Sequence, residues 1–216
     1  MRRVLSSILL IFGLFSTLFA QTDPKAKAIL AEVSKKYRSY KTIKSNFTFT
    51  VQNKQNNINE SQKGVLYVNS AANKYKVSMS DKDLISDGKT QWTYLKDDKE
   101  VQVSAAAGND DALNPAKVFT MYENGFKYLY TGESKVAAKT YQMIDLSPTD
   151  TKKPYFKIRL SIDKATKQIA KVLIFDKNGS NYTYTITGFS GGTAVPESTF
   201  VFDAKKFPGV EVVDLR

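Results

Sequence analysis

Apolar and polar residues alternate along most of the chain after residue 41, and a period of two is typical of β-strands that bury one face. Polar turns separate these segments, with Asn178-Gly179 as a strong hairpin signal. We therefore predict about eleven consecutive antiparallel strands. The alternating segments lie at 46–51, 64–68, 74–79, 84–85, 91–94, 101–103, 126–130, 141–146, 155–160, 169–175, 182–186, 200–202 and 210–213.

Two segments instead repeat their apolar residues at steps of three and four, which predicts amphipathic helices. Asp23 is a suitable N-cap for the first helix, and Pro24 suits its first position. A second, shorter helix is expected from Asn114 to about Gly125. The apolar residues of the two helices are Ala26, Ile29, Leu30, Val33, Tyr37 and Tyr40 in the first, and Val118, Phe119 and Tyr122 in the second.

These elements predict an α+β fold that is mainly β. So many strands do not form one open layer with water on both sides, and we expect the sheet to curl into a half-closed antiparallel barrel. The amphipathic helices are then the elements available to cover its apolar concave side.

One hairpin raises a question about what its buried face contacts. Trp92 and Tyr94 lie on one face of the first arm, with Thr93 between them, and Val101 and Val103 continue the alternation on the second arm. The alternation predicts one buried face but does not say whether that face packs in the protein's own core or receives a ligand.

Composition removes several classes of chemistry. The 216 residues include no cysteine and no histidine, which excludes disulfides, thiolate nucleophiles, Ser-His triads and histidine-ligated metals. Most acidic residues stand in predicted turns, so we expect no catalytic site, no metal and no cofactor. A hydrolase that uses carboxylates remains a less favoured alternative.

The N-terminus predicts secretion. Met1-Arg2-Arg3 precedes an apolar run from Val4 to Phe19, and we expect residues 1–20 to be a signal peptide that is cleaved after Ala20. Residues 21–216 then form a single periplasmic domain, expected to be a monomer. The net charge of +11 would suggest a nucleic-acid partner, but secretion argues against one, and the lysines alternate with apolar residues along the strands.

Several stretches resemble the LolA family of outer-membrane lipoprotein carriers. Residues 86–94, SDGKTQWTY, look like the family's central strand-turn-strand signature, and residues 73–79, NKYKVSM, resemble the aromatic strand before it. The ending is similar to the family's last strands, with FVFD at 200–203 and FPGVEVVD at 207–214. With the predicted helices in the expected order, the resemblance covers nearly the whole of residues 21–216.

The resemblance implies an unclosed barrel of about eleven strands under a lid of two or three α-helices, with a hydrophobic cavity between them. It implies a carrier that takes acylated lipoproteins from an inner-membrane ABC transporter of the Lol type to an outer-membrane lipoprotein receptor. The chain departs from the family at residues 68–72, VNSAA, where an arginine that holds the lid shut is missing. Asn69 or Ser70 would supply only weaker, neutral hydrogen bonds there.

On this hypothesis, inward-facing side chains bind the acyl chains and the two helices supply the lid. Each residue could equally be ordinary core, and the same fold could bind another lipid or a glycolipid. The predicted cavity residues are Phe47, Phe49, Tyr75, Val77, Met79, Trp92, Tyr94, Val101, Val103, Ile158, Leu160, Tyr184 and Ile186, and the predicted lid residues are Leu30, Val33, Val118 and Phe119.

Overall fold

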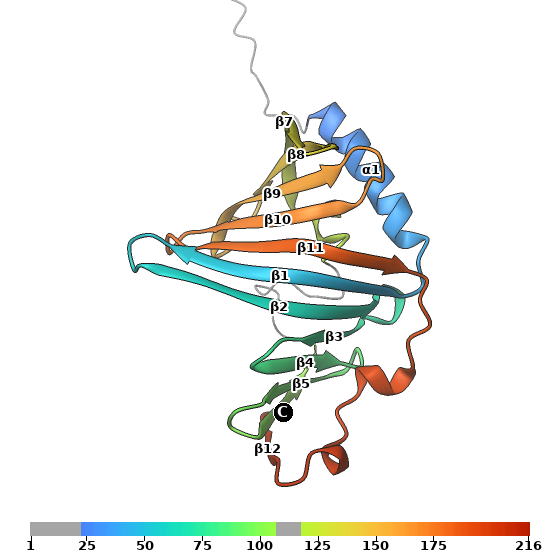
Figure 1. Cartoon of the computed structure of the whole chain (residues 1–216), viewed down its shortest axis with the longest axis vertical. Coiled ribbons are helices and arrows are strands. Elements are labelled where there is room, and N and C mark those ends of the chain that lie inside the picture. The colour runs from blue at the N-terminus through green and yellow to red at the C-terminus, as the bar shows by residue number, and fades with distance from the viewer. Residues whose placement is uncertain (1–22, 107–117) are drawn as a thin grey trace, which may run out of the picture.

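The computed structural model describes residues 23–106 and 118–216, and Figure 1 shows them as a bent sheet with a helix beside its upper half. The predicted signal peptide at 1–20, and Asn114 and Pro115 of the second predicted helix, lie outside the described residues. The strands are β1 (Ile43–Asn53), β2 (Ile58–Asn69), β3 (Lys74–Ser78), β4 (Lys82–Ser86), β5 (Thr90–Leu95), β6 (Glu100–Ala105), β7 (Phe126–Val136), β8 (Lys139–Pro148), β9 (Tyr155–Asp163), β10 (Ile169–Asp176), β11 (Asn181–Gly191) and β12 (Glu211–Asp214). The helices are α1 (Pro24–Arg38) and the short 3-10 helices η1 (Ser70–Ala72), η3 (Met121–Glu123), η4 (Glu197–Phe200) and η5 (Ala204–Lys206).

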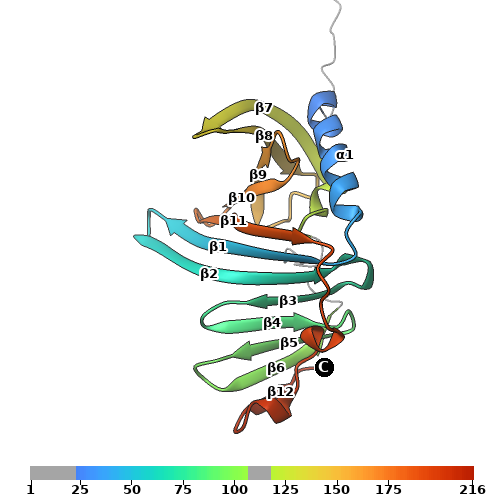
Figure 2. The same cartoon turned by 45° about the vertical axis from the view of Figure 1, so that its right-hand side comes forward.

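All twelve described strands belong to one sheet, in the order β12-β6-β5-β4-β3-β2-β1-β11-β10-β9-β8-β7. Strands β1 to β6 form one antiparallel series and β7 to β11 another, and the pairing of β11 with β1 joins the two. The twist between neighbouring strands accumulates over so wide a sheet and bends it. Figure 2 shows this bend, and the edges β7 and β12 do not pair with each other. The predicted open antiparallel barrel is therefore confirmed.

Helix α1 starts where the sequence predicts. The Asp23 side chain accepts hydrogen bonds from the backbone N–H groups of Lys25 and Ala26, and its second oxygen accepts one from Tyr130 N–H at 3.0 Å. At the other end of α1, the Tyr37 hydroxyl accepts a hydrogen bond from Ile169 N–H at 2.9 Å. These two contacts fix the helix from β7 to β10, across one half of the sheet.

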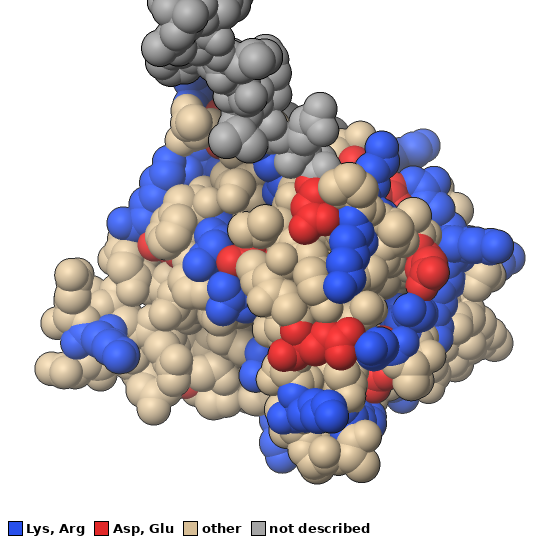
Figure 3. Space-filling model, turned by 90° about the horizontal axis from the view of Figure 1, so that it is seen from above, with Lys and Arg blue, Asp and Glu red and all other residues tan. Residues whose placement is uncertain are grey.

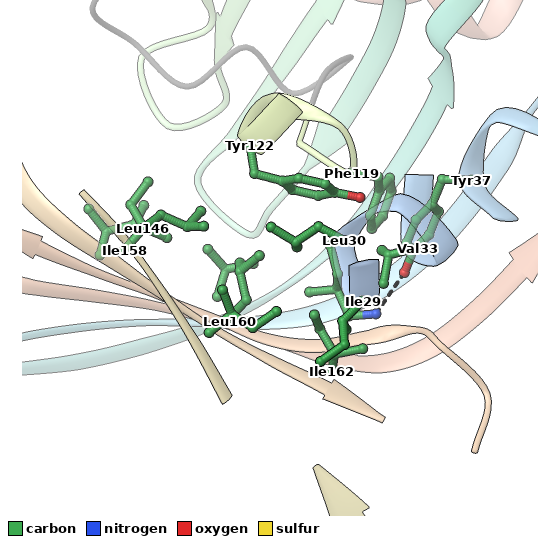
Figure 4. Close-up of a cluster of buried hydrophobic side chains, with 14 of the residues drawn as sticks. Ile29, Leu30, Val33, Tyr37, Phe119, Tyr122, Leu146, Ile158, Leu160 and Ile162 are labelled. Atoms are coloured by element: carbon green, nitrogen blue, oxygen red, sulfur yellow. Dashed lines mark hydrogen bonds between the residues drawn. The ribbon is translucent and has the colours of Figure 1, made fainter. Parts of the chain in front are cut away.

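The apolar stripe of α1 packs against β8 and β9 in the main core, which Figure 4 shows in close-up. Leu30 and Val33 come from the helix, and the fully buried Leu146, Ile158 and Leu160 come from the sheet. Each large aliphatic side chain buried in this way contributes about 1.5–3 kcal/mol. Packing on the sheet therefore stabilises this helix, which is too short to be more than marginally stable alone.

The C-terminal part of the chain differs from the prediction. Residues 200–202, expected to form a strand, do not join the sheet. Phe200 is the last residue of η4 and residues 201–202 follow it, and the side chains of Phe200 and Phe202 are buried. Strand β12 joins β6 in parallel, with Val212 opposite Val101, whereas an antiparallel partner was expected. The chain crosses from β11 to the far edge of the sheet before it pairs, and such a crossover allows a parallel strand where a short hairpin would not.

The second predicted helix is only partly described. Residues 118–120 form a turn and η3 follows, so the described part does not continue as an α-helix to Gly125. Helix α1 is therefore the one α-helix in residues 23–106 and 118–216, and the segment 118–123 provides further cover beside it. No helix in these parts of the chain has the length and hydropathy needed to cross a membrane.

Candidate functional site

A cavity of about 400 Å³ lies on the concave side of the sheet. Strands from both antiparallel series line it, and the turn at 118–119 covers it. Almost all of the lining is apolar or aromatic, which is typical of sites for small apolar ligands. The lining residues are Phe47, Phe49, Leu66, Val77, Met79, Lys82, Leu84, Thr93, Val118, Phe119, Ile169, Val172, Tyr184 and Ile186.

One wall of the cavity is built at the seam between β1 and β11. The pairing register places Phe47 opposite Ile186 and Phe49 opposite Tyr184, so all four side chains lie on the concave face. The ring of Tyr184 lies 4.8 Å from that of Phe49 and 6.0 Å from that of Phe47. Burial raises the pKa of Tyr184 to about 12, so this wall is uncharged at neutral pH.

A row of paired residues forms the opposite wall. Leu66 on β2 is opposite Val77 on β3, Val77 is opposite Leu84 on β4, and Leu84 is opposite Thr93 on β5. Directly opposite residues share a face of the sheet. The row is therefore apolar from β2 to β4 and becomes polar at β5.

Phe119 covers the cavity and is held there by aromatic contacts. Its ring stacks on Tyr37 of α1 with centroids 4.5 Å apart, and it meets Phe189 edge-on at 6.0 Å. Phe119 is 3 % exposed. The ring thus fills space between the helix and the concave face, in direct contact with the cavity.

Polar contacts with α1 hold the same covering segment in place. The Ser34 hydroxyl donates to the Tyr122 hydroxyl at 3.2 Å, and the Arg38 guanidinium donates to both carboxylate oxygens of Glu123. The hydrogen bonds from Arg38 lower the pKa of Glu123, despite an opposing effect of burial. The segment 118–123 is therefore tied to the helix by an ion pair, a hydroxyl pair and an aromatic stack.

This geometry, an apolar cavity between a half-closed antiparallel barrel and a cover attached to an N-terminal helix, agrees with a family comparison. Residues 38–203 match the family model described as outer membrane lipoprotein carrier protein LolA. The chain belongs to the LolA family. No curated protein sequence matches it significantly.

Solved structures share the LolA-family fold at low sequence identity. An uncharacterized conserved protein from Thermus thermophilus has a TM-score of 0.55 and 15% identity, with 88% of this chain and 99% of that one covered. A structure described as an outer membrane lipoprotein-sorting protein domain, from Vibrio parahaemolyticus, has a TM-score of 0.51 and 13% identity, with 82% and 96% covered. At such identities, the likeness shows the fold alone.

The structure separates the predicted cavity and lid residues into groups. Tyr75, Ile158 and Leu160 face the concave side but lie in the packed core, as do the lid residues Leu30 and Val33. These five residues support the cavity without lining it. The predicted residues that line it are Phe47, Phe49, Val77, Met79, Val118, Phe119, Tyr184 and Ile186.

Four predicted cavity residues lie on the opposite face of the sheet, and their assignment to the cavity is corrected. Trp92 is opposite Val103 and Tyr94 is opposite Val101, so all four point away from the concave side. They belong to or adjoin a second apolar cluster on the convex face, which the C-terminal segment covers. The Tyr94 ring lies 5.4 Å from Phe202. The aromatic face of this hairpin therefore packs against the protein's own chain, and its polar face is turned towards the concave side.

Several lining residues are not among those predicted from the sequence. Leu66 and Leu84 belong to segments already predicted as strands, but Leu66 has two apolar neighbours and Leu84 has one, so alternation alone did not show that they face the cavity. Val172 begins the apolar run VLIF at 172–175, in which alternation does not distinguish the two faces. Lys82 and Thr93 were not expected, because polar residues were assigned to solvent.

The family's lid-locking arginine has no replacement at Asn69. The Asn69 side-chain oxygen accepts a hydrogen bond from Ala72 N–H at 3.3 Å and thereby caps η1. Arg38 is instead the arginine that contacts the cover, through Glu123. A contact between helix and cover is therefore present in this member of the LolA family, but a different part of the chain provides it.

Basic residues are distributed over the surface and do not form one continuous patch on the face seen in Figure 3, where acidic side chains lie among them. Several are paired, including Arg159 with Asp145 at 2.6 Å and Lys164 with Glu133 at 2.8 Å. The described residues contain no group of three or more acidic side chains that could hold a metal ion.

Proposed function

We propose that this protein is a periplasmic carrier that binds the acyl chains of lipoproteins in the concave cavity and moves them from the inner to the outer membrane. The observation that supports this most directly is the apolar cavity of about 400 Å³ beneath Phe119. Such a cavity offers apolar surface to an acyl chain, and among the described residues its lining contains no carboxylate. The proposed role is therefore transport without chemical change, and the protein is not an enzyme.

The energetics of lipid transfer explain why a carrier needs such a cavity. Exposure of an acyl chain to water costs about 0.8 kcal/mol per CH₂ group, so a chain of about fifteen carbons resists leaving a membrane by roughly 12 kcal/mol. A carrier must replace most of that energy with its own apolar surface. Phe47, Phe49 and Tyr184 provide a large, uncharged aromatic wall for this purpose.

The cover gives the carrier a way to release its passenger. Val118 and Phe119 line the cavity and also pack against the main core, so they compete with an acyl chain for the same apolar space. Binding then shifts the cover away from the cavity, and its return favours release. The contacts of segment 118–123 with Tyr37, Ser34 and Arg38 determine how strongly the cover competes with an acyl chain for the cavity.

The family description, outer membrane lipoprotein carrier protein, supports the finer parts of the proposal. We propose that residues 1–20 direct the chain to the periplasm and that residues 21–216 act there as a single monomeric domain. The donor is an inner-membrane ABC transporter of the Lol type, and the acceptor is an outer-membrane lipoprotein receptor. Nucleic acid has no part in this function.

A second candidate is a periplasmic binding protein or sensor for another lipid or glycolipid. Cavity size favours it, because about 400 Å³ is near the lower end of the range of about 300–1,000 Å³ for ligand sites. A cargo with several acyl chains requires displacement of the cover, whereas a single-chain lipid requires less. Mass spectrometry of copurified ligand distinguishes acylated peptides from other lipids.

The proposal is tested with vesicles that hold a fluorescent, acylated lipoprotein. Incubation with the purified protein should move the label into the soluble fraction, and the variant Phe49→Glu should not, because a carboxylate placed against Tyr184 makes burial of an acyl chain unfavourable. Thr50→Glu is the matched control, since Thr50 is the next residue on β1 and points to the convex face. Equal extraction by Phe49→Glu and the parent would reject the cavity as the binding site.

A further inference from the structure

The cavity lining is polar at one end only. Among its described residues Lys82 is the single charged side chain, and Thr93 is the single aliphatic hydroxyl. Ile169 and Val172, from β10, are apolar. A ligand that fills this cavity therefore meets different chemistry at its two ends.

The register of β4 and β5 places the two polar side chains on one wall. Lys82 is two residues before Leu84 and lies on the same face of β4, and Thr93 is directly opposite Leu84 on β5. Lys82 and Thr93 are therefore diagonal neighbours, a relation that brings Cα atoms to about 7–8 Å across antiparallel strands. An ammonium and a hydroxyl at this spacing can both reach one headgroup.

The ammonium of Lys82 keeps capacity for a further anionic partner. The carboxylate of Asp81 lies near it, but Oδ2 is 3.9 Å from Nζ, beyond hydrogen-bond distance. An ammonium has three N–H donors. The Lys82 side chain is 44 % exposed, so its aliphatic stem lines the cavity while its charged end reaches the rim.

Beyond Thr93 the concave face stays polar. Thr93 is opposite Gln102 on β6, and the neighbouring row contains Gln91, whose side-chain oxygen accepts a hydrogen bond from the Tyr75 hydroxyl at 2.7 Å. A lipid whose chain lies in the cavity thus encounters hydrogen-bonding groups at the β5 and β6 side. This side is where its headgroup is accommodated best.

We infer that Lys82 and Thr93 form a headgroup site for lipids that carry a carboxylate or phosphate next to the acyl chain. This inference rests on the proposed binding of acyl chains and adds a preference for anionic over neutral lipids. Lys82 supplies the charge, Thr93 supplies a hydroxyl donor, and the aromatic wall holds the chain. A hydrogen bond from an ammonium to an anion near apolar surface is stronger than one between neutral groups.

The test compares lipids that share one chain and differ in headgroup. Displacement of the neutral dye N-phenyl-1-naphthylamine from the full domain is measured at pH 8 with palmitate, hexadecyl phosphate and methyl palmitate, each below the concentration at which it forms micelles. The parent should bind the two anions about tenfold more tightly than the ester. Inorganic phosphate alone should displace no dye, because the chain supplies most of the affinity.

Variants separate the charge of Lys82 from its apolar stem. Lys82→Met keeps the approximate length of the side chain and should abolish the preference for the two anions over methyl palmitate, and Lys82→Arg should retain that preference. Lys171→Met removes the same charge from the exposed face of β10, next to the cavity residue Val172, and should change nothing. Asp81→Asn should increase the preference, because it removes the competing carboxylate.

The outcomes distinguish this inference from the proposed function. Equal affinity of the parent for palmitate and its methyl ester would refute the headgroup site, and so would a preference for anionic lipids that persists in Lys82→Met. Neither result would contradict the binding of acyl chains in the cavity. Failure of the dye and of all three lipids to bind would overturn the acyl cavity, and the headgroup site with it. Displacement by inorganic phosphate as strong as by hexadecyl phosphate would show an anion site that is independent of the chain, contrary to the inference.

Discussion

Replacement of Phe119 by alanine tests whether its ring is ordinary core or a displaceable cover. Phe119 is 3 % exposed, and burial of a phenylalanine side chain contributes about 1.5–3 kcal/mol. The stack on Tyr37 and the edge contact with Phe189 add about 0.5–1.5 kcal/mol each. We therefore expect Phe119→Ala to lower the free energy of unfolding by about 3 kcal/mol.

The same variant should bind acyl chains more tightly. If a ligand must displace the Phe119 ring, binding loses the burial energy of that ring, and the alanine variant avoids this loss. A saving of about 1.5–3 kcal/mol corresponds to a gain in affinity of roughly 10- to 100-fold, because 1.4 kcal/mol is a factor of ten. Urea unfolding measures the stability, and displacement of a neutral dye by methyl palmitate measures the affinity.

Leu160→Ala is the control for loss of stability without a change in the cavity. Leu160 is 1 % exposed in the packed core and does not line the cavity, so the variant should lose about 2–5 kcal/mol of stability and gain no affinity. If Phe119→Ala behaved as Leu160→Ala does, with lower stability and unchanged or weaker binding, Phe119 would be core and the idea of a competing cover would be refuted.

Three further predictions concern the cover, the cavity wall and the convex face. Arg38 holds the pKa of Glu123 below its ordinary value of 4.5, so the ion pair stabilises the cover above pH 4.5 and is lost as the pH falls through the lowered pKa. Dye uptake should therefore rise in that acidic range. The variant Glu123→Gln should remove this pH dependence. Gly64→Ala should lower stability by about 1–3 kcal/mol and weaken acyl binding, as seen in unfolding and dye assays, because the added methyl group overlaps the Phe47 ring in the cavity wall. The fluorescence of Trp92, the one tryptophan of the chain, should not change when an acyl ligand binds, because Trp92 lies on the opposite face.

Matched variants make the last two predictions specific. Gly191→Ala overlaps the ring of Tyr40, which does not line the cavity, so it should reduce stability and leave affinity unchanged. Phe202→Ala should shift the Trp92 emission without affecting lipid binding, since Phe202 belongs to the convex cluster. A ligand-induced change in Trp92 emission as large as that caused by Phe202→Ala would contradict the assignment of Trp92 to the convex face.

The sequence by itself determined the local elements and the exclusion of most chemistry. The cap at Asp23, the three- and four-residue spacing of α1 and the period of two in β1 and β11 all depend on neighbours within a few residues. The pattern therefore placed Phe47, Phe49 and Tyr184 on one face of their strands, and in the structure they line one cavity. The absence of cysteine and histidine needed no structure at all.

Only the tertiary structure decided which face of each strand is concave and what covers it. Alternation in the Trp92 hairpin shows that one face is buried, but burial comes from Phe202 and Phe207, more than a hundred residues later in the chain. In the same way, Phe119 becomes a cover through its stack on Tyr37, and β12 becomes parallel through a crossover of the whole sheet. Contacts between segments so distant in sequence depend on how the sheet bends and on which segments then pack against each face. The alternation of residues along a strand cannot predict these contacts, because a two-residue period is identical for both faces.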